Sequence, residues 1–164
     1  MNNIIEDLYV KYYKTAYIYT FSLCKNKELT EDIVSEAFEK AILTINVEKK
    51  HFKYWLLVVC KNCWFDQVRK NKKLIPELLN ENQWLENETV IDKIMEKENN
   101  RVLFKAILQL SEKYKEVLIL HYYAEIPLVE IEKIMNLSKA NTKTLIYRAR
   151  VKLRKVLEEA GYEY

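Results

Sequence analysis

Apolar side chains in the N-terminal half recur at every third or fourth position, the spacing that places them on one face of an α-helix. The first predicted helix runs from Ile4 to about Leu23. The second begins after a polar break, with Thr30 as its N-cap and acidic residues in its first turn. The buried stripes of these two helices are Ile4, Leu8, Tyr12, Ala16 and Tyr19, then Ile33, Ala37, Phe38, Ala41, Ile42 and Ile45.

A third periodic stretch follows the predicted loop 46–50. It starts near Phe52, and its stripe consists of Phe52, Trp55, Leu56, Val59, Cys60 and Cys63. The stretch then ends in the basic run 69–73. Residues 74–99 contain Pro76, many Asn and Glu, and too few apolar residues for a core, so we predict a linker there.

The C-terminal part is periodic again and predicts a helix-turn-helix. Residues 101–123 form two helices with Ser111 as the cap between them, and Pro127 is suited to the start of another helix. A short helix over 128–134, a tight turn over 135–137, and a final helix from Ser138 to about Glu159 complete the motif.

Composition favours helices, and the sequence contains no segment typical of export. One Gly and two Pro in 164 residues leave few positions for hairpin turns, so we predict an all-α protein with two small helical domains joined by a flexible acidic linker. The predicted domains are 1–73 and 100–164. There is no apolar run of about 20 residues and no basic-then-apolar start, so we expect a cytoplasmic protein without membrane insertion. The three cysteines are expected to be reduced thiols.

Charge is divided along the chain in a pattern that the net +3 conceals. Residues 1–73 hold 13 Lys/Arg against 9 Asp/Glu, residues 74–99 hold 2 against 7, and residues 100–164 hold 12 against 8. Two basic ends joined by an acidic middle are typical of two modules that bind a polyanion through a connector that does not. A solvated surface with uneven charge is the alternative at this point.

The final helix carries side chains suited to DNA recognition. In a helix-turn-helix, the first turns of the second helix contact base edges in the major groove, and nearby basic residues hold phosphates. The candidate contacts are Lys139, Asn141, Lys143, Thr144, Tyr147, Arg148 and Arg150. An ordinary solvated basic helix is the structural alternative.

Several ordered motifs resemble the sigma-70 family of sigma factors, in its short extracytoplasmic-function class. Residues 8–13 (LYVKYY), 29–38 (LTEDIVSEAF) and 52–56 (FKYWL), with Asn62, Asp66, Arg69 and Lys70, resemble the family's region two. Residues 110–118 (LSEKYKEVL) and 148–154 (RARVKLR) resemble region four. The chain departs from the family pattern at Ser35 (usually Gln), at Asn136 and Ala140 (usually Gly), and at Thr142 (usually Val).

The resemblance implies that residues 1–73 bind core RNA polymerase and open the minus-ten element, while residues 100–164 read the minus-thirty-five element of promoter DNA. Polymerase is expected to bind a polar, mostly acidic patch at Asp32, Ser35, Glu36 and Glu39, which could otherwise be a solvated face. The expected minus-ten contacts are Asn46, Lys49, Lys50, His51, Phe52, Tyr54, Asn62, Arg69, Lys70 and Lys73. The aromatic side chains of this set could stack on a base that has left the duplex, and the basic side chains would bind phosphate. Trp55 is expected to pack in the core.

The resemblance thus implies a promoter-specific initiation factor, with no catalysis, no cofactor and no small-molecule substrate. The alternative is a conventional helix-turn-helix regulator that binds duplex operators without polymerase, and a helical adaptor for acidic proteins is a more distant one. Cys60 and Cys63 lack a second ligand pair, so we expect no metal site, and neither His51 nor His121 has a partner that spells out a triad. Because the resemblance is to a short class without a sensory domain, we also expect an anti-sigma protein to hold the factor inactive.

Overall fold

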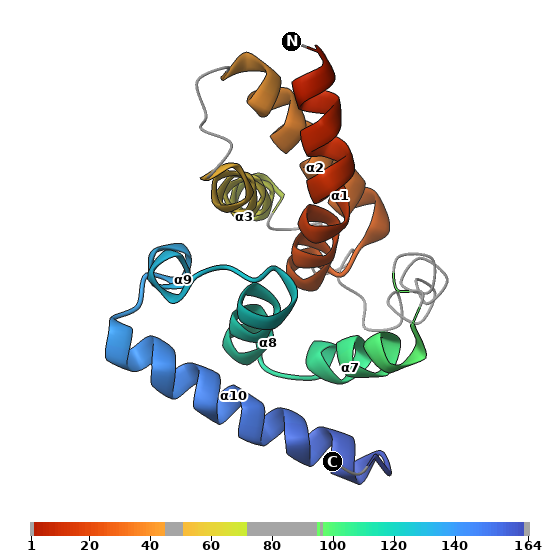
Figure 1. The fold of residues 1–164 in the computed structure, drawn as a ribbon, viewed down its shortest axis with the longest axis vertical. Coiled ribbons are helices and arrows are strands. Elements are labelled where there is room, and N and C mark those ends of the chain that lie inside the picture. Colours follow the sequence, from red (N-terminus) through yellow and green to blue (C-terminus); the bar gives the residue numbers. More distant parts are fainter. Residues whose placement is uncertain (1, 45–50, 72–94, 96, 163–164) are drawn as a thin grey trace. The chain divides into compact units, whose positions relative to one another are not determined.

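The computed structural model describes residues 2–44, 51–71, 95 and 97–162, and the regular structure in these ranges is helical throughout (Figure 1). The chain forms two compact units, Met1–Val90 and Ile91–Tyr164. The predicted all-α fold with two helical domains is therefore confirmed. In the described ranges, no helix is both long enough and apolar enough to cross a membrane.

The N-terminal unit is a bundle of three helices, α1 (Asn2–Cys24), α2 (Lys27–Leu43) and α3 (Phe52–Lys70), and each helix contacts the other two. The three predicted helices are confirmed, and most of the predicted stripe residues pack into one core or against it. That core consists of Ala16, Cys24, Ile33, Val34, Ala37, Phe38, Ala41, Phe52, Leu56, Cys60, Cys63 and Trp64. Ile4 and Ile42, which were also predicted to be buried, are exposed near the ends of α1 and α2, and Ile45 lies outside the described residues. Burial of these stripes fixes which faces of α1, α2 and α3 remain exposed.

The start of α2 corrects the predicted N-cap. Asn26 is the cap: its side-chain oxygen accepts a hydrogen bond from the Leu29 amide at 2.9 Å, and the helix begins at Lys27. Thr30 lies inside the first turn, fully buried, and its hydroxyl donates to the Asn26 carbonyl oxygen at 2.7 Å. Asn and Thr are both good N-cap residues, so the sequence alone did not decide between a helix that starts after Asn26 and one that starts after Thr30.

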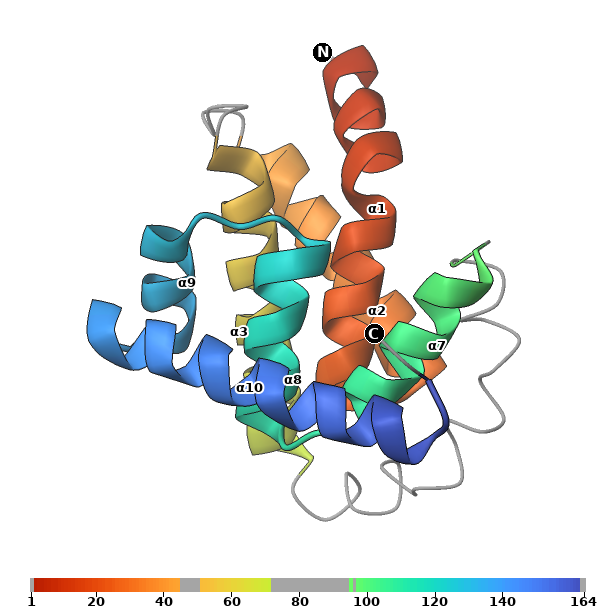
Figure 2. The same ribbon diagram turned by 60° about the horizontal axis from the view of Figure 1, so that its bottom comes forward.

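The C-terminal unit consists of α7 (Glu98–Leu108), α8 (Glu112–Leu118), a π-helical turn η2 (Ile119–Tyr123), α9 (Leu128–Met135) and α10 (Lys139–Glu159). Figure 2 shows the long helix α10, which contacts α7, α8 and α9. Ser138 caps α10 as predicted, because its hydroxyl accepts a hydrogen bond from the Asn141 amide at 3.1 Å. The predicted helix-turn-helix is present as α9 and α10.

The turn between α9 and α10 depends on a left-handed residue. Asn136 has φ 54° and ψ 52°, and the Leu137 amide donates to the Glu132 carbonyl oxygen at 3.0 Å, which closes α9. Asn adopts this conformation more readily than other non-glycine residues. The chain can therefore turn sharply at a position where the family usually has glycine.

Candidate functional site

The first turns of α10 present the predicted DNA contacts to solvent. Thr142, Ile146 and Ala149 are buried, which orients the helix and leaves its other sides open. The exposed residues include all seven predicted contacts, Lys139, Asn141, Lys143, Thr144, Tyr147, Arg148 and Arg150. The Tyr147 side chain is 69% exposed, so its ring is available to a partner.

A groove runs between the start of α8 and one side of α10. It has a volume of about 530 Å³ and is lined by Ser111, Glu112, Lys113, Tyr114, Leu137, Asn141, Thr144, Leu145 and Arg148. Lys113 and Arg148 contribute two cationic residues to this lining, and Ser111, Tyr114 and Thr144 contribute hydroxyls. The carboxylate of Glu112, which also lines the groove, is paired with Lys115, so the other polar residues suit a phosphate backbone. Lys113 and Tyr114 were not predicted as contacts from the sequence, because they lie far along the chain from α10, the helix that we call the recognition helix.

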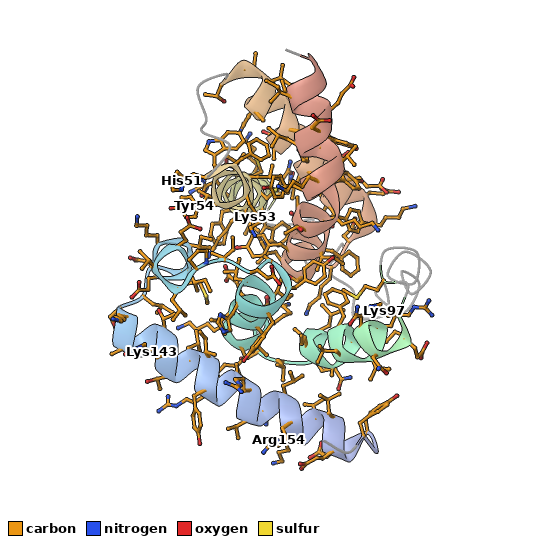
Figure 3. The ribbon with its side chains drawn as sticks, in the orientation of Figure 1. His51, Lys53, Tyr54, Lys97, Lys143 and Arg154 are labelled. Atoms are coloured by element: carbon orange, nitrogen blue, oxygen red, sulfur yellow. The ribbon has the colours of Figure 1, made fainter. Side chains whose placement is uncertain are left out.

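The other side of α10 carries three cations and a tyrosine. Lys143, Tyr147, Arg150 and Arg154 are all exposed and follow one another at intervals of four, three and four residues, so they share one side of the helix. Figure 3 labels Lys143 and Arg154 along α10. We call these four residues the basic row. The recognition helix is therefore flanked by cations on both sides.

In the N-terminal unit, the start of α3 groups three of the residues suited to nucleic acid (Figure 3). His51 is exposed, while Lys53 and Tyr54 are half-buried. The predicted contacts Asn46, Lys49, Lys50 and Lys73 lie outside the described residues.

The structure corrects the role that was predicted for Phe52. Its side chain is only 3% exposed, and ring centroids of Tyr12, Phe38 and Trp55 lie 5.6, 6.3 and 5.7 Å from its own. No face of the ring is open to stack on a base, so the base-capture role predicted for Phe52 is wrong and the residue packs the core. Trp55 is half-buried and packs against this core, as expected.

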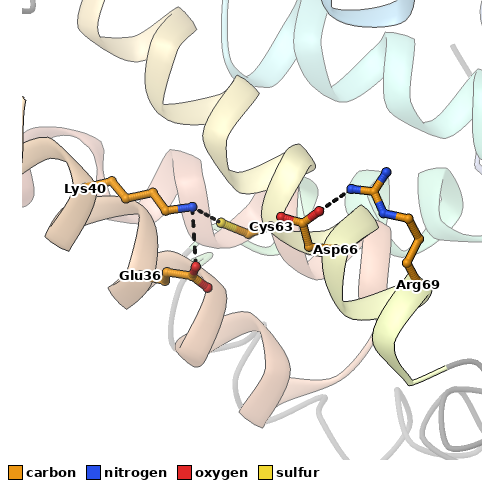
Figure 4. A network of polar contacts seen from close by, with 5 residues as sticks. All are labelled: Glu36, Lys40, Cys63, Asp66 and Arg69. Carbon is orange, nitrogen blue, oxygen red and sulfur yellow. Dashed lines mark hydrogen bonds and ion pairs between the residues drawn. The ribbon is translucent and has the colours of Figure 1, made fainter.

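The end of α3 is basic and exposed. Asn62, Arg69 and Lys70 are all open to solvent. The Arg69 guanidinium pairs with the Asp66 carboxylate one turn earlier (Figure 4). Exposed pairs of this kind contribute little to stability, so Arg69 can exchange Asp66 for a phosphate at small cost.

The predicted polymerase-binding patch lies along α2. Asp32, Ser35 and Glu39 are exposed. Glu36 is half-buried, and its carboxylate lies 3.4 Å from the Lys40 ammonium, which in turn reaches the Cys63 sulfur at 3.6 Å (Figure 4). Glu36 is thus partly occupied by a contact within the unit, and Asp32 and Glu39 are the more accessible charges.

An apolar groove adjoins this patch. It has a volume of about 540 Å³ and lies between α1 and α2, lined by Ile5, Glu6, Tyr9, Val10, Ser35, Phe38, Glu39 and Ile42. Val10 is 80% exposed and Ile42 is 50% exposed, and because both line the same groove they present a shared apolar area, which is typical of an interaction site. The acidic residues of α2 were predicted from the sequence, but the apolar residues of the groove were not, since helical periodicity does not show which residues of α1 lie beside α2.

The cysteines are buried free thiols. Burial raises the pKa of the Cys60 thiol to about 12, and burial followed by the nearby Glu36 carboxylate raises the pKa of Cys63, against the opposing charge of Lys40. Among the residues with described positions, no group of three or more His, Cys, Asp or Glu side chains is arranged to hold a metal ion.

Comparison with known proteins shows the family to which the chain is related. Residues 8–74 match the family model of sigma-70 region 2, and residues 101–153 match that of sigma-70 region 4. The ECF RNA polymerase sigma factor SigM of Bacillus subtilis is 32% identical over 154 residues, which cover 92% of this chain and 93% of that protein. SigW, an ECF RNA polymerase sigma factor of the same species, is 31% identical over 169 residues, covering 94% and 88%.

A solved structure shares the fold. The sigma factor RpoE of Bartonella quintana, determined in complex with the anti-sigma factor NepR, has a TM-score of 0.61 and 17% identity, over 93% of this chain and 98% of that one. The helices and the two matched regions define a sigma-70 type transcription factor. The chain belongs to the ECF RNA polymerase sigma factors. It therefore directs promoter-specific transcription initiation, and a conventional regulator acting without polymerase is not favoured.

Proposed function

We propose that the two units divide promoter recognition between them. In this proposal residues 1–73 bind core polymerase and the minus-ten element, residues 74–99 are the linker, and residues 100–164 bind the minus-thirty-five element. The observation that supports it best is the exposed start of α10, with cations on both sides. A phosphate backbone on each side of a major groove needs such an arrangement.

The minus-thirty-five contacts in this proposal sort by position on α10. Lys143, Thr144 and Tyr147 face away from the buried side of α10, and Lys139 is exposed at the start of the helix; all four are suited to base edges. Lys113 and Arg148 hold one phosphate strand through the α8/α10 groove, and Arg150 holds the other. Base contacts should set which promoters are used, while phosphate contacts should set affinity and its salt dependence.

The minus-ten contacts that we propose in the described residues are His51, Tyr54, Asn62, Arg69 and Lys70. Tyr54 retains an exposed part and can stack on a base that has left the duplex. The basic end of α3 then supplies phosphate contacts. Asn46, Lys49, Lys50 and Lys73 remain in the proposal from the sequence alone.

The polymerase-binding surface that we propose combines the α2 patch with the apolar groove. Asp32 and Glu39 attract a basic partner, and Tyr9, Val10 and Ile42 offer apolar area beside them. Charged rims guide association, and buried apolar contacts hold the complex. A basic helical segment with one apolar face fits both parts.

Run-off transcription with core polymerase, on promoters from the source genome, tests this function. Product that appears only with the protein supports it, and Lys143→Ala should reduce product from promoters that depend on a minus-thirty-five element. Lys14→Ala removes another exposed lysine, on α1, and should leave product unchanged. Tight duplex binding by the protein alone, without initiation, would instead support the conventional regulator.

We also infer that the protein acts in the cytoplasm, needs no cofactor or small-molecule substrate, and has no catalytic activity of its own. The basis is that a sigma factor works as a binding partner of polymerase at DNA, where no step requires its own chemistry.

An anti-sigma partner is a further part of this proposal. The Bartonella structure contains such a protein, and the apolar groove on this chain is a surface that an inhibitor could cover in competition with polymerase. Affinity purification from native cells, under several stresses, should recover a stoichiometric inhibitor in at least one condition. Repeated purification without one would count against it.

A further inference from the structure

The π-helical turn η2 places an aromatic ring beside the recognition helix. The Ala124 amide donates to the Ile119 carbonyl oxygen at 2.8 Å, five residues back, which widens the last turn after α8. Ile119 and Leu120 remain buried, while the Tyr122 side chain is 48% exposed. Such turns occur often at functional sites, because they displace a side chain from the regular helical face.

The Tyr122 ring contacts two residues at once. The His121 ring meets it edge-on, with centroids 4.6 Å apart and planes at 71°. The central carbon of the Arg150 guanidinium lies 5.9 Å from the Tyr122 centroid, within range of a cation–π interaction. In the part of the chain with described positions, no carboxylate lies within ion-pair distance of Arg150.

A guanidinium that rests on an aromatic ring keeps its hydrogen-bond donors free. The cation–π contact draws on the positive charge of the group, whereas its five N–H donors remain available for hydrogen bonds. Arg150 also belongs to the basic row, between Tyr147 and Arg154. An arginine held this way loses less side-chain freedom when it binds phosphate than one that moves freely in water.

We propose that Tyr122 is a positioning residue that holds the Arg150 guanidinium for contact with a backbone phosphate of promoter DNA. This inference rests on the proposed DNA-binding role of the C-terminal unit. Tyr122 need not touch DNA itself, and its effect passes through Arg150. The hydroxyl of Tyr122 is not required, because the ring alone supplies the interaction.

A double-mutant cycle on the full chain, assembled with core polymerase, tests the inference. Promoter affinity is measured at two or more salt concentrations for the wild type, Tyr122→Leu, Arg150→Ala and the double variant. Tyr122→Leu should weaken binding by about two- to fivefold, the range of an exposed cation–π contact. Arg150→Ala should weaken binding and reduce the salt slope by about 1. In the Arg150→Ala background, Tyr122→Leu should change nothing further.

Tyr122→Phe is the matched control, since it keeps the ring and should bind as the wild type does. Equal losses from Tyr122→Leu with and without Arg150 would overturn the inference, as would no loss from Tyr122→Leu in the wild type. Thermal unfolding of each variant separates a loss of contact from a loss of fold. Lys143→Ala tests the underlying function: if it has no effect on promoter affinity, the proposed DNA-binding role fails, and if it weakens binding while the cycle shows no coupling, only the role of Tyr122 fails.

Discussion

Phe52 stabilises the N-terminal unit through its contacts with three aromatic rings, and this contribution can be measured apart from any DNA contact. Replacement of a buried Phe by Ala removes transfer energy and leaves a cavity, at a cost of about 3–5 kcal/mol. Phe52→Ala should lower the free energy of unfolding by that amount in urea titrations. Phe65→Ala makes the same change on the same helix at a side chain 46% exposed, and should cost less than about 1 kcal/mol. Similar losses at both positions would contradict the assignment of Phe52 to the core.

Cys60 gives the same unit a dependence on alkaline pH. Its pKa is raised from 9.0 to about 12 by burial, so the unfolded chain releases the thiol proton first as the pH rises. The contribution of Cys60 to the free energy of unfolding is therefore fully present below pH 9 and is lost as the pH rises from 9 toward 12. Between pH 8 and pH 10 the loss from Cys60 should be on the order of 1 kcal/mol, measured by urea unfolding at each pH. Cys60→Ala should show a shallower decline, and an unchanged decline would assign the effect to other groups.

At the scale of elements, the turn of the helix-turn-helix depends on the left-handed conformation of Asn136. Asn136→Ala places a Cβ in this region without the local hydrogen bonding that Asn provides, and should cost about 1 kcal/mol of stability. Asn136→Gly removes the steric penalty and should leave the free energy of unfolding unchanged or slightly higher. Chemical unfolding of the full chain measures both. If Ala and Gly behaved alike, backbone strain at this turn would not explain the preference for Asn.

Helical periodicity predicted the elements well, because an apolar stripe reports directly which face is buried. It located α1, α2, α3, α9 and α10. It could not tell a core aromatic from one that stacks on a base, since Phe52 fits either role at the same position. Nor could it show the π-helical turn before Ala124 or the cap at Asn26, where each choice depends on a single hydrogen bond.

Contacts between elements were the harder part of the site to predict. The side chains of α10 were identified as a set from one segment, because neighbours in sequence share a helix. The groove partners Lys113 and Tyr114 were not, since α8 and α10 meet only through tertiary packing. Tyr9 and Val10, which line the other groove together with Glu39, were missed for the same reason. Surfaces built from two helices require the fold, whereas surfaces on one helix can be predicted from its sequence.

At the scale of the whole molecule, the proposed division of labour predicts that variants in the two units fail at different steps. Glu39→Lys reverses a charge at the α1/α2 groove and should weaken binding to core polymerase in the absence of DNA. Raising the concentration of the Glu39→Lys variant should restore transcription, because the surface that binds promoter DNA is unchanged. Lys143→Ala should bind core polymerase normally but lose promoter affinity and some of its preference for the minus-thirty-five sequence.

Two measurements separate these outcomes: the affinity of labelled protein for core polymerase, and the affinity of the preassembled holoenzyme for promoter DNA. Asp7→Lys makes the same charge reversal on α1 at an exposed residue that does not line the groove, and it should bind polymerase as the wild type does. A general effect of net charge would affect Asp7→Lys and Glu39→Lys equally. If Glu39→Lys lowered promoter affinity of the assembled holoenzyme as much as Lys143→Ala does, the two units would not act at separate steps.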